Sequence, residues 1–344
     1  MTELKYPKGS EWRKWDLHVQ TILDDGYISI GEYLDDIKNN SIEKYNELVK
    51  RIGSEDLVKK YDSKDYFYTD SQDDEKKRAE NYSNLFLNYV DIFNTDVGVI
   101  GVTDHNYENQ FLLDCLINKV NDFNFRIIPG VEINIQGVHV LIYFGDKPYQ
   151  KTTYSEGIKI FLGRINVTNR KTNNILTVCN KSYADVIREV KELKAVLIYP
   201  HCNSSNGLFQ ERGKTDRTHL ADQFNHQEFN ILQSKNKESA DAVSAYISTL
   251  TTLKSGSVFT LGSDARALKD ILQGDKDSNY LWIKADPTFE GLKQIIYEPE
   301  QRIFIGSQKP EEKKPYFVID KVRFIDNAGE GRFGSEQIEI NQNL

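Results

Sequence analysis

Four histidines and three acidic residues of this sequence lie at the ends of short apolar runs. Of the six histidines in the chain, the four in this pattern are His18, His105, His139 and His201. The acidic residues are Asp25 in "LDDG", Glu132 in "PGVEI" and Asp264 in "LGSDA". Imidazole and carboxylate groups are together the ligands of divalent cations such as zinc, manganese and iron. The pattern therefore predicts a metal site assembled from distant parts of the chain.

The apolar runs themselves are typical of buried β-strands. They cover residues 97–103, 125–135, 138–144, 195–200, 228–233, 257–263 and 279–285. Segments with a helical period, 182–193 and 239–253, lie between some of them. This alternation indicates parallel strands with crossover helices and favours an α/β barrel, in which functional side chains lie at strand ends.

Each residue of the pattern also has a simpler explanation when it is taken alone. A single histidine in an apolar strand, such as His139 or His201, is often a hydrogen-bonded core residue. Asp264 could cap a helix, and Asp25 before Gly26 could belong to a turn. One metal site accounts for all of them in order along the chain, and we favour that interpretation.

Bulk properties narrow the class of protein. The 344 residues are 39% hydrophobic, without an apolar run long enough to span a bilayer or an N-terminal signal core, so no membrane partner is expected. Three cysteines without a ligand-like spacing (Cys115, Cys179, Cys202) indicate a reducing, cytoplasmic location without disulfides. The net charge of −8 argues against nucleic-acid binding by bulk electrostatics but leaves room for a local basic cleft.

The composition also indicates how the chain is organised. Residues 27–81 are polar and helical in part, and 146–181 lack clear periodicity, so both are expected to be insertions on the barrel. The charged, proline-bounded stretch 306–315 predicts a linker after a first domain of residues 1–305. Residues 316–344 are expected to begin a second domain with two strands.

The ordered motifs resemble the PHP (polymerase and histidinol phosphatase) superfamily over residues 12–305. They are "DLHVQT", "DDG", "GVTDH", "PGVEI", "VHVLIYF", "YPH" and "GSDAR". The resemblance implies a distorted seven-stranded β/α barrel that holds up to three divalent metals and hydrolyses phosphoesters. More narrowly, "GSEWRKWDLH", "SSNGLF" and "TFEGLKQIIYEPEQRI" are similar to TrlF-type proteins, whose PHP domain is fused to an AAA/SMC-like ATPase and several of which belong to anti-phage defence loci.

Site residues follow from this resemblance by position. The implied metal ligands are His18, Asp25, His105, Glu132, His139, His201 and Asp264, with Glu132 bridging two ions. The implied catalytic positions are His18, Gln20, Asp25, His105, Asp264 and Arg266. Two of these depart from the family pattern, because Gln20 stands where the first pair has a second histidine and Arg266 where the closing motif has one.

Both departures weaken the expected site. A glutamine amide binds such a metal more weakly than imidazole, and arginine does not deprotonate to become a ligand. Glu132, His139 and His201 keep one ion site intact in this interpretation. Arg266 could instead bind a phosphate through its guanidinium group. Arg212, Lys214 and Arg217, on a long loop after His201, could contact phosphate as a lid or form a solvated charged run.

The leading hypothesis is a metal-dependent phosphoesterase, specifically a nuclease on DNA or RNA that serves an ATPase-coupled defence protein. The alternative is a catalytically inactive barrel that binds nucleic acid, a nucleotide or a partner protein and regulates the attached ATPase. A small-molecule phosphatase is the third possibility. Expected partners are nucleic acid, the ATPase domain of the same protein, and a homo-oligomer or defence-system partner.

Overall fold

The computed structural model describes residues 11–69, 73–106, 111–151, 153–173, 175–212, 217–310, 321–323 and 337–339. Its main sheet contains β1 (Trp12–Val19), β2 (Val97–Val102), β3 (Arg126–Ile135), β4 (Val138–Tyr143), β7 (Val178–Cys179), β8 (Val196–Tyr199), β9 (Phe229–Ser234), β10 (Gly256–Leu261), β11 (Tyr280–Lys284) and β12 (Ile303–Gly306). Seven of these strands, β2, β3, β4, β8, β9, β10 and β11, coincide with the seven predicted apolar runs, whereas β1, β7 and β12 were not among the predicted runs. Their order is β10-β9-β8-β4-β3-β2-β1-β11-β12, with β7 paired to β3.

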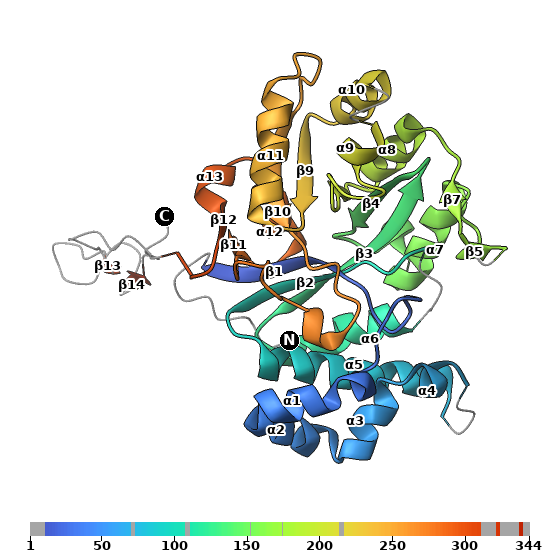
Figure 1. Cartoon of the computed structure of the whole chain (residues 1–344), viewed down its shortest axis with the longest axis vertical. Helices are drawn as coiled ribbons and strands as arrows, with labels where there is room; N and C mark the ends of the chain where they lie inside the picture. The colour runs from blue at the N-terminus through green and yellow to red at the C-terminus, as the bar shows by residue number, and fades with distance from the viewer. Residues whose placement is uncertain are drawn as a thin grey trace, which may run out of the picture.

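The path from β10 to β1 curves into a barrel (Figure 1). Most neighbours in it are parallel, but β4 runs antiparallel to both β3 and β8. The two ends of the path meet where Ala265, just after β10, forms a parallel bridge with Val19 at the end of β1. Two backbone hydrogen bonds close the ring. The Gln20 amide donates to the carbonyl oxygen of Ala265 at 2.9 Å, and the Ala265 amide donates to that of His18 at 3.1 Å. The predicted α/β class with a distorted barrel is confirmed.

Apolar side chains fill the barrel interior, as expected for a ring of this size. One buried residue from each of six strands joins the same cluster: Val99, Ile128, Leu141, Ile198, Ile231 and Val258. Tyr143 crosses the interior at a height where β2 carries Gly101. A Cβ at Gly101 would lie 2.7 Å from the Tyr143 hydroxyl oxygen, so glycine is required there. The interior is therefore a packed core, and polar side chains are left for its rim.

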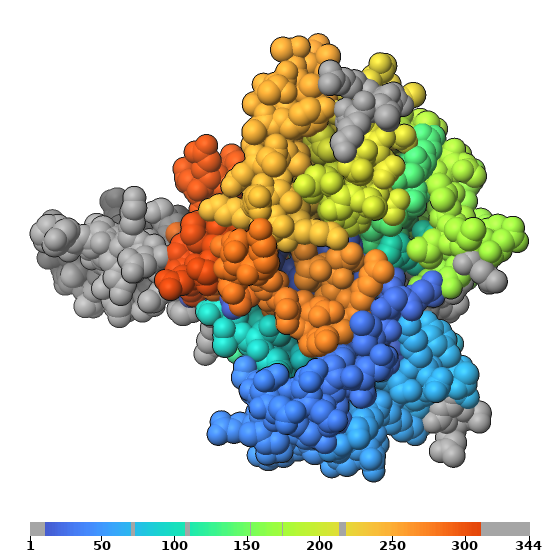
Figure 2. All heavy atoms as spheres, viewed as in Figure 1, coloured from blue at the N-terminus to red at the C-terminus, as the bar shows by residue number. Residues whose placement is uncertain are grey.

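Helices from the long insertion between β1 and β2 form a lobe beside the barrel, blue in Figure 2. They are η1 (Ile30–Glu32), α1 (Leu34–Asn40), α2 (Ile42–Ile52), α3 (Glu55–Tyr61), α4 (Lys64–Thr69) and α5 (Glu75–Phe93). The buried carboxylate of Asp62 anchors this lobe to the chain that leaves β1. It accepts hydrogen bonds from the Tyr27 hydroxyl at 2.6 Å and from the Ile30 amide at 2.5 Å.

The remaining described helices cover the barrel or lie in its loops. They are α6 (Leu112–Lys119), η2 (Val120–Asp122), η3 (Pro148–Gln150), α7 (Tyr154–Arg164), α8 (Tyr183–Glu192), α9 (Leu208–Arg212), α10 (Arg217–Asn225), α11 (Lys237–Ser248), η4 (Leu268–Asp270), α12 (Phe289–Gln294) and α13 (Pro299–Arg302). The predicted helices 182–193 and 239–253 correspond to α8 and α11. Residues 146–181, which lack clear periodicity in the sequence and were expected to be an insertion, contain α7 and a small hairpin of β5 (Lys171–Thr172) and β6 (Ile175–Leu176).

Beyond the barrel, β13 (Lys321–Arg323) pairs antiparallel with β14 (Gln337–Glu339). Each lies in one of the two C-terminal segments expected to form strands. The second half of the predicted linker, 311–315, lies outside the described residues. A second, ATPase-like domain stays a prediction. In the described part of the chain, no helix is both long enough and apolar enough to cross a membrane.

Candidate metal centre

Polar side chains from the barrel strands meet at one end of the ring. Along β3, Ile128 faces the interior and Glu132 lies on the same face at the rim, because side chains alternate with a period of two. β4 runs in the opposite direction, so His139 near its start lies beside the end of β3, opposite Asn134 in the ladder. A tight turn with positive φ at Gln136 (52°) and Gly137 (95°) makes this reversal possible.

The Glu132 carboxylate is the centre of this group of side chains, and one of its oxygens lies close to three side-chain nitrogens. Glu132 Oε2 lies 2.9 Å from His18 Nε2 and 2.6 Å from Gln20 Nε2. It also lies 3.3 Å from His105 Nε2. These partners come from the end of β1 and from the residues after β2. One oxygen atom therefore joins two separate segments of the chain.

The other oxygen of Glu132 faces two further histidines. Glu132 Oε1 lies 2.6 Å from His139 Nδ1 and 3.7 Å from His201 Nε2. Burial opposes ionisation of Glu132, whose side chain is 1% exposed, but the neighbouring His105 and His18 outweigh this and hold its pKa well below its usual range. The carboxylate is thus anionic and has imidazoles around both oxygens, as a bridging ligand would.

Two overlapping groups of side chains have ligand atoms close enough to share a cation. One consists of His105, Glu132 and His139, and the other of His18, Glu132 and Asp264, with all ligand atoms of each group within 4.8 Å of one another. Two buried atoms in these groups, His105 Nε2 and Asp264 Oδ1, make no hydrogen bond within the described part of the chain. Buried polar atoms are normally satisfied, so the donor set and these two atoms fit a divalent cation.

The structure places Asp24, and not Asp25, next to the histidines. Asp24 Oδ2 is 2.9 Å from His105 Nδ1, which turns the other ring nitrogen toward Glu132. Burial disfavours the charged His105 ring, but Glu132 and Asp24 outweigh this and raise its pKa to about 10. The Asp25 carboxylate is 52% exposed and lies 2.8 Å from Lys171 Nζ. The assignment of Asp25 as the ligand after the first histidine therefore does not agree with this geometry.

The two positions that depart from the family pattern both face the cluster. Gln20 is buried and donates through Nε2 to Glu132, while its Oε1 has no hydrogen-bond partner in the described residues. Arg266 is 41% exposed, and its Nε lies 3.5 Å from Asp264 Oδ1. A Cβ at Gly26 would lie 3.0 Å from Arg266 Nη1, so the guanidinium group covers that glycine. A donor amide and a cation thus lie beside the two carboxylates.

His201 and Asp264 are held in unusual backbone conformations. Their φ angles are 31° and 48°, in a region that side-chain-bearing residues rarely adopt. His201 lies just after β8, and Asp264 just after β10. Strained backbone of this kind concentrates at functional sites, where the surrounding structure maintains it.

Some residues that position the cluster could not be recognised from motifs. Gln233 on β9 has its Oε1 3.0 Å from His18 Nδ1, which fixes the orientation of that ring. Gly262 leaves the space for this amide, because a Cβ there would lie 2.2 Å from the Gln233 side chain. Asp104 of the "TDH" motif accepts from the Thr21 amide at 2.6 Å and its hydroxyl at 2.8 Å. A polar residue inside a buried strand was the one available signal for Gln233.

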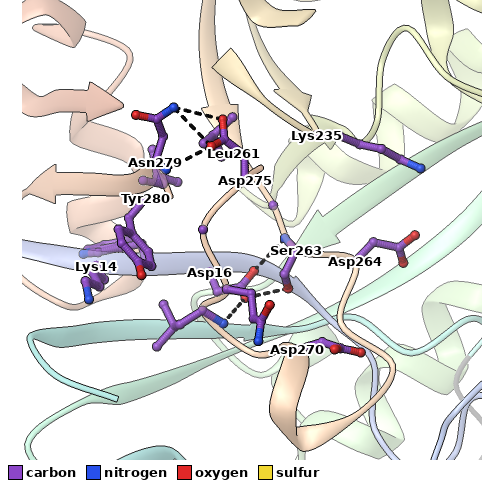
Figure 3. A pocket seen from close by; sticks show the side chains of 16 residues that line it. Lys14, Asp16, Lys235, Leu261, Ser263, Asp264, Asp270, Asp275, Asn279 and Tyr280 are labelled. Atoms are coloured by element: carbon purple, nitrogen blue, oxygen red, sulfur yellow. Dashed lines mark hydrogen bonds between the residues drawn. The ribbon is translucent and has the colours of Figure 1, made fainter. Parts of the chain in front are cut away.

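A hollow of about 360 Å³ lies beside the segment that follows β10, and its lining includes Asp16, Ser263 and Asp264 (Figure 3). Ser263 Oγ donates to Asp16 Oδ2 at 2.6 Å inside it. The neighbouring carboxylate of Asp264 is turned away from Asp16 in Figure 3, and its Oδ1 lies 3.6 Å from His18 Nε2. Ser263 thus anchors the backbone to Asp16, whereas the next residue, Asp264, directs its carboxylate toward His18.

The loop predicted to act as a phosphate-contacting lid is described only in part. Arg212 donates through Nη2 to the carbonyl oxygen of Gln136 at 2.7 Å, at the turn between β3 and β4. Lys214 lies outside the described residues, and Arg217 begins α10. A role of this loop in phosphate binding stays a prediction.

No protein-family model and no curated protein matches the sequence. Among solved structures, the chain is similar to a two-domain protein from Bacteroides vulgatus described as containing a PHP-like metal-dependent phosphoesterase, at 12% identity and a TM-score of 0.40. It is also similar to endonuclease Q bound to a 27-mer duplex with an abasic lesion, at 12% identity and a TM-score of 0.47. A third likeness, at 11% identity and a TM-score of 0.37, is to a protein from Bifidobacterium adolescentis described as a metal-dependent phosphoesterase.

The matches cover 86%, 83% and 74% of this chain, respectively. They span 64% of the Bacteroides vulgatus chain, 56% of endonuclease Q and 88% of the Bifidobacterium adolescentis chain. At these identities, the activity of this chain has to be inferred from its own site.

Proposed function

We propose that this chain is a metal-dependent phosphoesterase that cleaves a phosphodiester of DNA or RNA. The observation that carries the proposal is the Glu132 carboxylate, whose two oxygens face histidines from four strand ends of the barrel. Next to it, His105 Nε2 and Asp264 Oδ1 are buried without hydrogen-bond partners in the described residues. Such a donor set is suited to zinc, manganese or iron.

The residues divide into ligands and residues that position them. One ion would be held by His105, Glu132 and His139, and a second by His18, Glu132 and Asp264. Bound there, the ions would acidify a water molecule and neutralise charge at phosphorus. Asp24 fixes the His105 ring through Nδ1, and a partner of this kind keeps the other ring nitrogen available as a ligand.

Arg266 and Gln20 have different roles in this proposal. The Arg266 guanidinium group is partly exposed at the opening of the cluster and can donate two parallel hydrogen bonds to a phosphate group. It thereby supplies positive charge at a position where the family pattern has a histidine. Gln20 contributes a weak ligand or a hydrogen bond to Glu132, so we expect the second ion to bind more weakly than the first.

Metal content and cleavage, measured in the same preparations, test this function. The protein is purified with zinc, manganese or iron, its metal is quantified by elemental mass spectrometry, and it is incubated with single- and double-stranded DNA and RNA. Stoichiometric metal together with cleavage supports the proposal. Faster turnover of mononucleotides or sugar phosphates than of polymers would identify a small-molecule phosphatase instead. Absence of phosphoester cleavage with every metal would exclude the enzyme function.

A second candidate function is that of an inactive barrel that binds a nucleic-acid end, a nucleotide or a partner protein. The hydrogen bond from Gln20 to Glu132 at 2.6 Å favours it, because a donor amide occupies one of the carboxylate's acceptor positions. In this case the protein would bind oligonucleotides while holding less than one metal ion per chain. A full complement of tightly bound metal would count against it.

We further propose that the barrel serves a larger ATPase-coupled defence protein. The TrlF-like segments and the charged stretch 306–315 support this, together with the strand-forming sequences that follow. The full-length protein should then hydrolyse ATP, and nucleic acid that binds the barrel should change the rate. An ATPase rate that is independent of nucleic acid would contradict this coupling.

A further inference from the structure

The carboxylate of Asp25 is surrounded by cations that the metal centre does not use. Lys171 Nζ lies 2.8 Å from Asp25 Oδ2, and Arg170 Nη2 lies 3.9 Å from Asp25 Oδ1. Lys64 Nζ donates to the main-chain oxygen of Asp25 at 2.8 Å. We call these four residues the Asp25 cluster. It combines three positive charges with one negative charge, in a chain whose net charge is −8.

Arg170 is the unusual member of the Asp25 cluster. Its side chain is only 7% exposed, yet Nε and Nη2 make no hydrogen bond within the described part of the chain. Buried guanidinium groups normally use their donors, because leaving them unpaired costs free energy. The ion pair with Asp25 at 3.9 Å is longer than a hydrogen bond. The guanidinium group also interacts with the Tyr68 hydroxyl, but Arg170 Nε and Nη2 remain available for an oxyanion.

The fold holds Arg170 next to the metal centre. Asn106, the residue after His105, donates through Nδ2 to the carbonyl oxygens of Arg170 at 3.1 Å and of Thr177 at 2.8 Å. Asp24 and Asp25 are consecutive, so their Cα atoms are about 3.8 Å apart. Asp24 faces His105, and Asp25 faces the cations. One turn of the chain therefore borders two adjacent sites.

An exposed aromatic ring borders the same turn. Tyr68, on α4 with Lys64, is 52% exposed, and its hydroxyl donates to the carbonyl oxygen of Leu23 at 3.5 Å. Aromatic side chains interleaved with cations are typical of surfaces that bind single strands, because any base can stack on the ring while the cations hold the backbone. A phosphate on a small metabolite would require no such ring.

We propose that Lys64, Arg170 and Lys171 form a second phosphate subsite, which holds a phosphate of the strand next to the one at the metal centre, and that Tyr68 stacks on an adjacent base. This inference rests on the proposed function and narrows its substrate to a nucleic-acid strand. Before the strand binds, the Asp25 carboxylate pairs with Arg170 and Lys171, and its main-chain oxygen accepts from Lys64. The phosphate then replaces the carboxylate as the partner of Arg170 and Lys171 and adds a charged partner for Lys64.

Binding measured without catalysis tests the subsite separately from the enzyme function. The probe is a fluorescein-labelled single-stranded DNA of about 20 nucleotides, longer than the footprint of a typical single-strand site, and its anisotropy is titrated in chelator at several salt concentrations. The double variant Lys64→Ala/Lys171→Ala should bind at least tenfold more weakly, with a salt slope lower by about 0.7 for each lost contact. Tyr68→Ala should weaken binding by about fivefold to a hundredfold.

A matched pair of substitutions at the turn distinguishes the two adjacent sites. Asp25→Asn should tighten DNA binding severalfold and keep the metal content of the wild type, because it removes the carboxylate that competes with phosphate. Asp24→Asn should lower the metal content, because it removes the partner of His105. The control is Lys50→Ala on α2, whose side chain is 81% exposed and which should bind DNA as the wild type does.

Two results would overturn the subsite. One is DNA binding by Lys64→Ala/Lys171→Ala that equals that of Lys50→Ala, with thermal melts showing that both are folded. The other is loss of metal in Asp25→Asn, which would make Asp25 a ligand. If the wild-type protein binds DNA through Lys64 and Lys171 but cleaves nothing with any metal, the subsite is supported and the proposed enzyme function fails.

Discussion

The consecutive carboxylates of Asp24 and Asp25 lead into two regions that are built differently. On the Asp24 side, ligand atoms come from the ends of barrel strands, whose register is fixed by the ring. On the Asp25 side, the cations come from α4 and from the start of the hairpin β5–β6, both of which lie in insertions. The difference supports the proposal that the barrel supplies the metal-binding chemistry and that the insertions select the substrate.

The two regions also differ in how deeply their carboxylates are buried. The Glu132 side chain is 1% exposed and that of Asp25 is 52% exposed. Charges in the interior interact strongly, whereas exposed ion pairs are screened by water and salt. Substitutions at the metal centre should therefore have large effects that depend little on salt, and substitutions in the Asp25 cluster should have smaller effects that fade at high salt.

The largest effect is expected for Glu132→Gln. The amide cannot bridge two cations, and removing the charge also leaves His18 and His105 without their shared anionic partner. Because loss of an outer-shell partner alone costs about tenfold to a hundredfold, loss of the bridge should reduce metal affinity and cleavage by more than about a hundredfold. Elemental analysis and nuclease assays measure both quantities. Glu290→Gln, at an exposed position, is the control, and wild-type metal content in Glu132→Gln would refute the assignment.

Gln20→His is expected to raise metal content and cleavage, because it introduces the second imidazole that the PHP motif has at this position. The new ring should strengthen the weaker cation group and raise cleavage by about tenfold or more. Gln301→His on α13 shows whether an added surface histidine is sufficient to increase metal content. If Gln20→His gains neither metal nor activity, Arg266 limits the site, and the double variant Gln20→His/Arg266→His becomes the decisive comparison.

A smaller effect is expected for Gly262→Ala, and it should affect the barrel but not the Asp25 cluster in the insertions. The new Cβ would collide with the Gln233 side chain, which orients His18, so we expect a loss of about 1–3 kcal/mol in the free energy of unfolding. Metal affinity should fall with it, whereas DNA binding in chelator should not. Gly163→Ala in α7, where a Cβ would meet nothing within 4 Å, should instead stabilise the protein by up to about 1 kcal/mol. Denaturant titration measures both, and equal stabilities of the two variants would contradict the collision.

The smallest effect concerns Asp62, which anchors the helical lobe. Burial raises the pKa of Asp62 to about 7, although the hydrogen bonds from Tyr27 and Ile30 oppose this. Between about pH 4 and pH 7 the folded protein then holds a proton that the unfolded chain has lost, so stability should fall as pH rises through this range. In the wild type, the free energy of unfolding should fall by about 1 kcal/mol or more between pH 5 and pH 7 because of Asp62, and Asp62→Asn should not show this fall. Parallel slopes in the two proteins would exclude the effect.

The sequence predicted seven of the ten strands of the main sheet and the histidines beside strand ends, because apolar runs and rare imidazoles carry strong signals. It did not distinguish Asp24 from Asp25, since the direction of two neighbouring carboxylates at a turn depends on the surrounding chain. Gln233 and Arg170 were also missed. Neither residue type marks a metal site, and their importance comes from contacts with segments far away in sequence. Residues 146–181 showed no clear period because Gly157 and Gly163 interrupt the apolar pattern of α7.

The hairpin β3–β4 has a consequence for the order in which the protein assembles. It places Glu132 and His139 together across only seven residues of chain, whereas His18 and Glu132 are 114 residues apart. Hairpins form in microseconds, and contacts between distant segments form later. We therefore expect the first half-site to exist before the ring closes, whereas Asp264 joins His18 only when Ala265 reaches β1. A cation bound to His18 and Asp264 would then fasten the first strand of the ring to its last, and its removal should expose the amides of β1 and β10 to hydrogen exchange first.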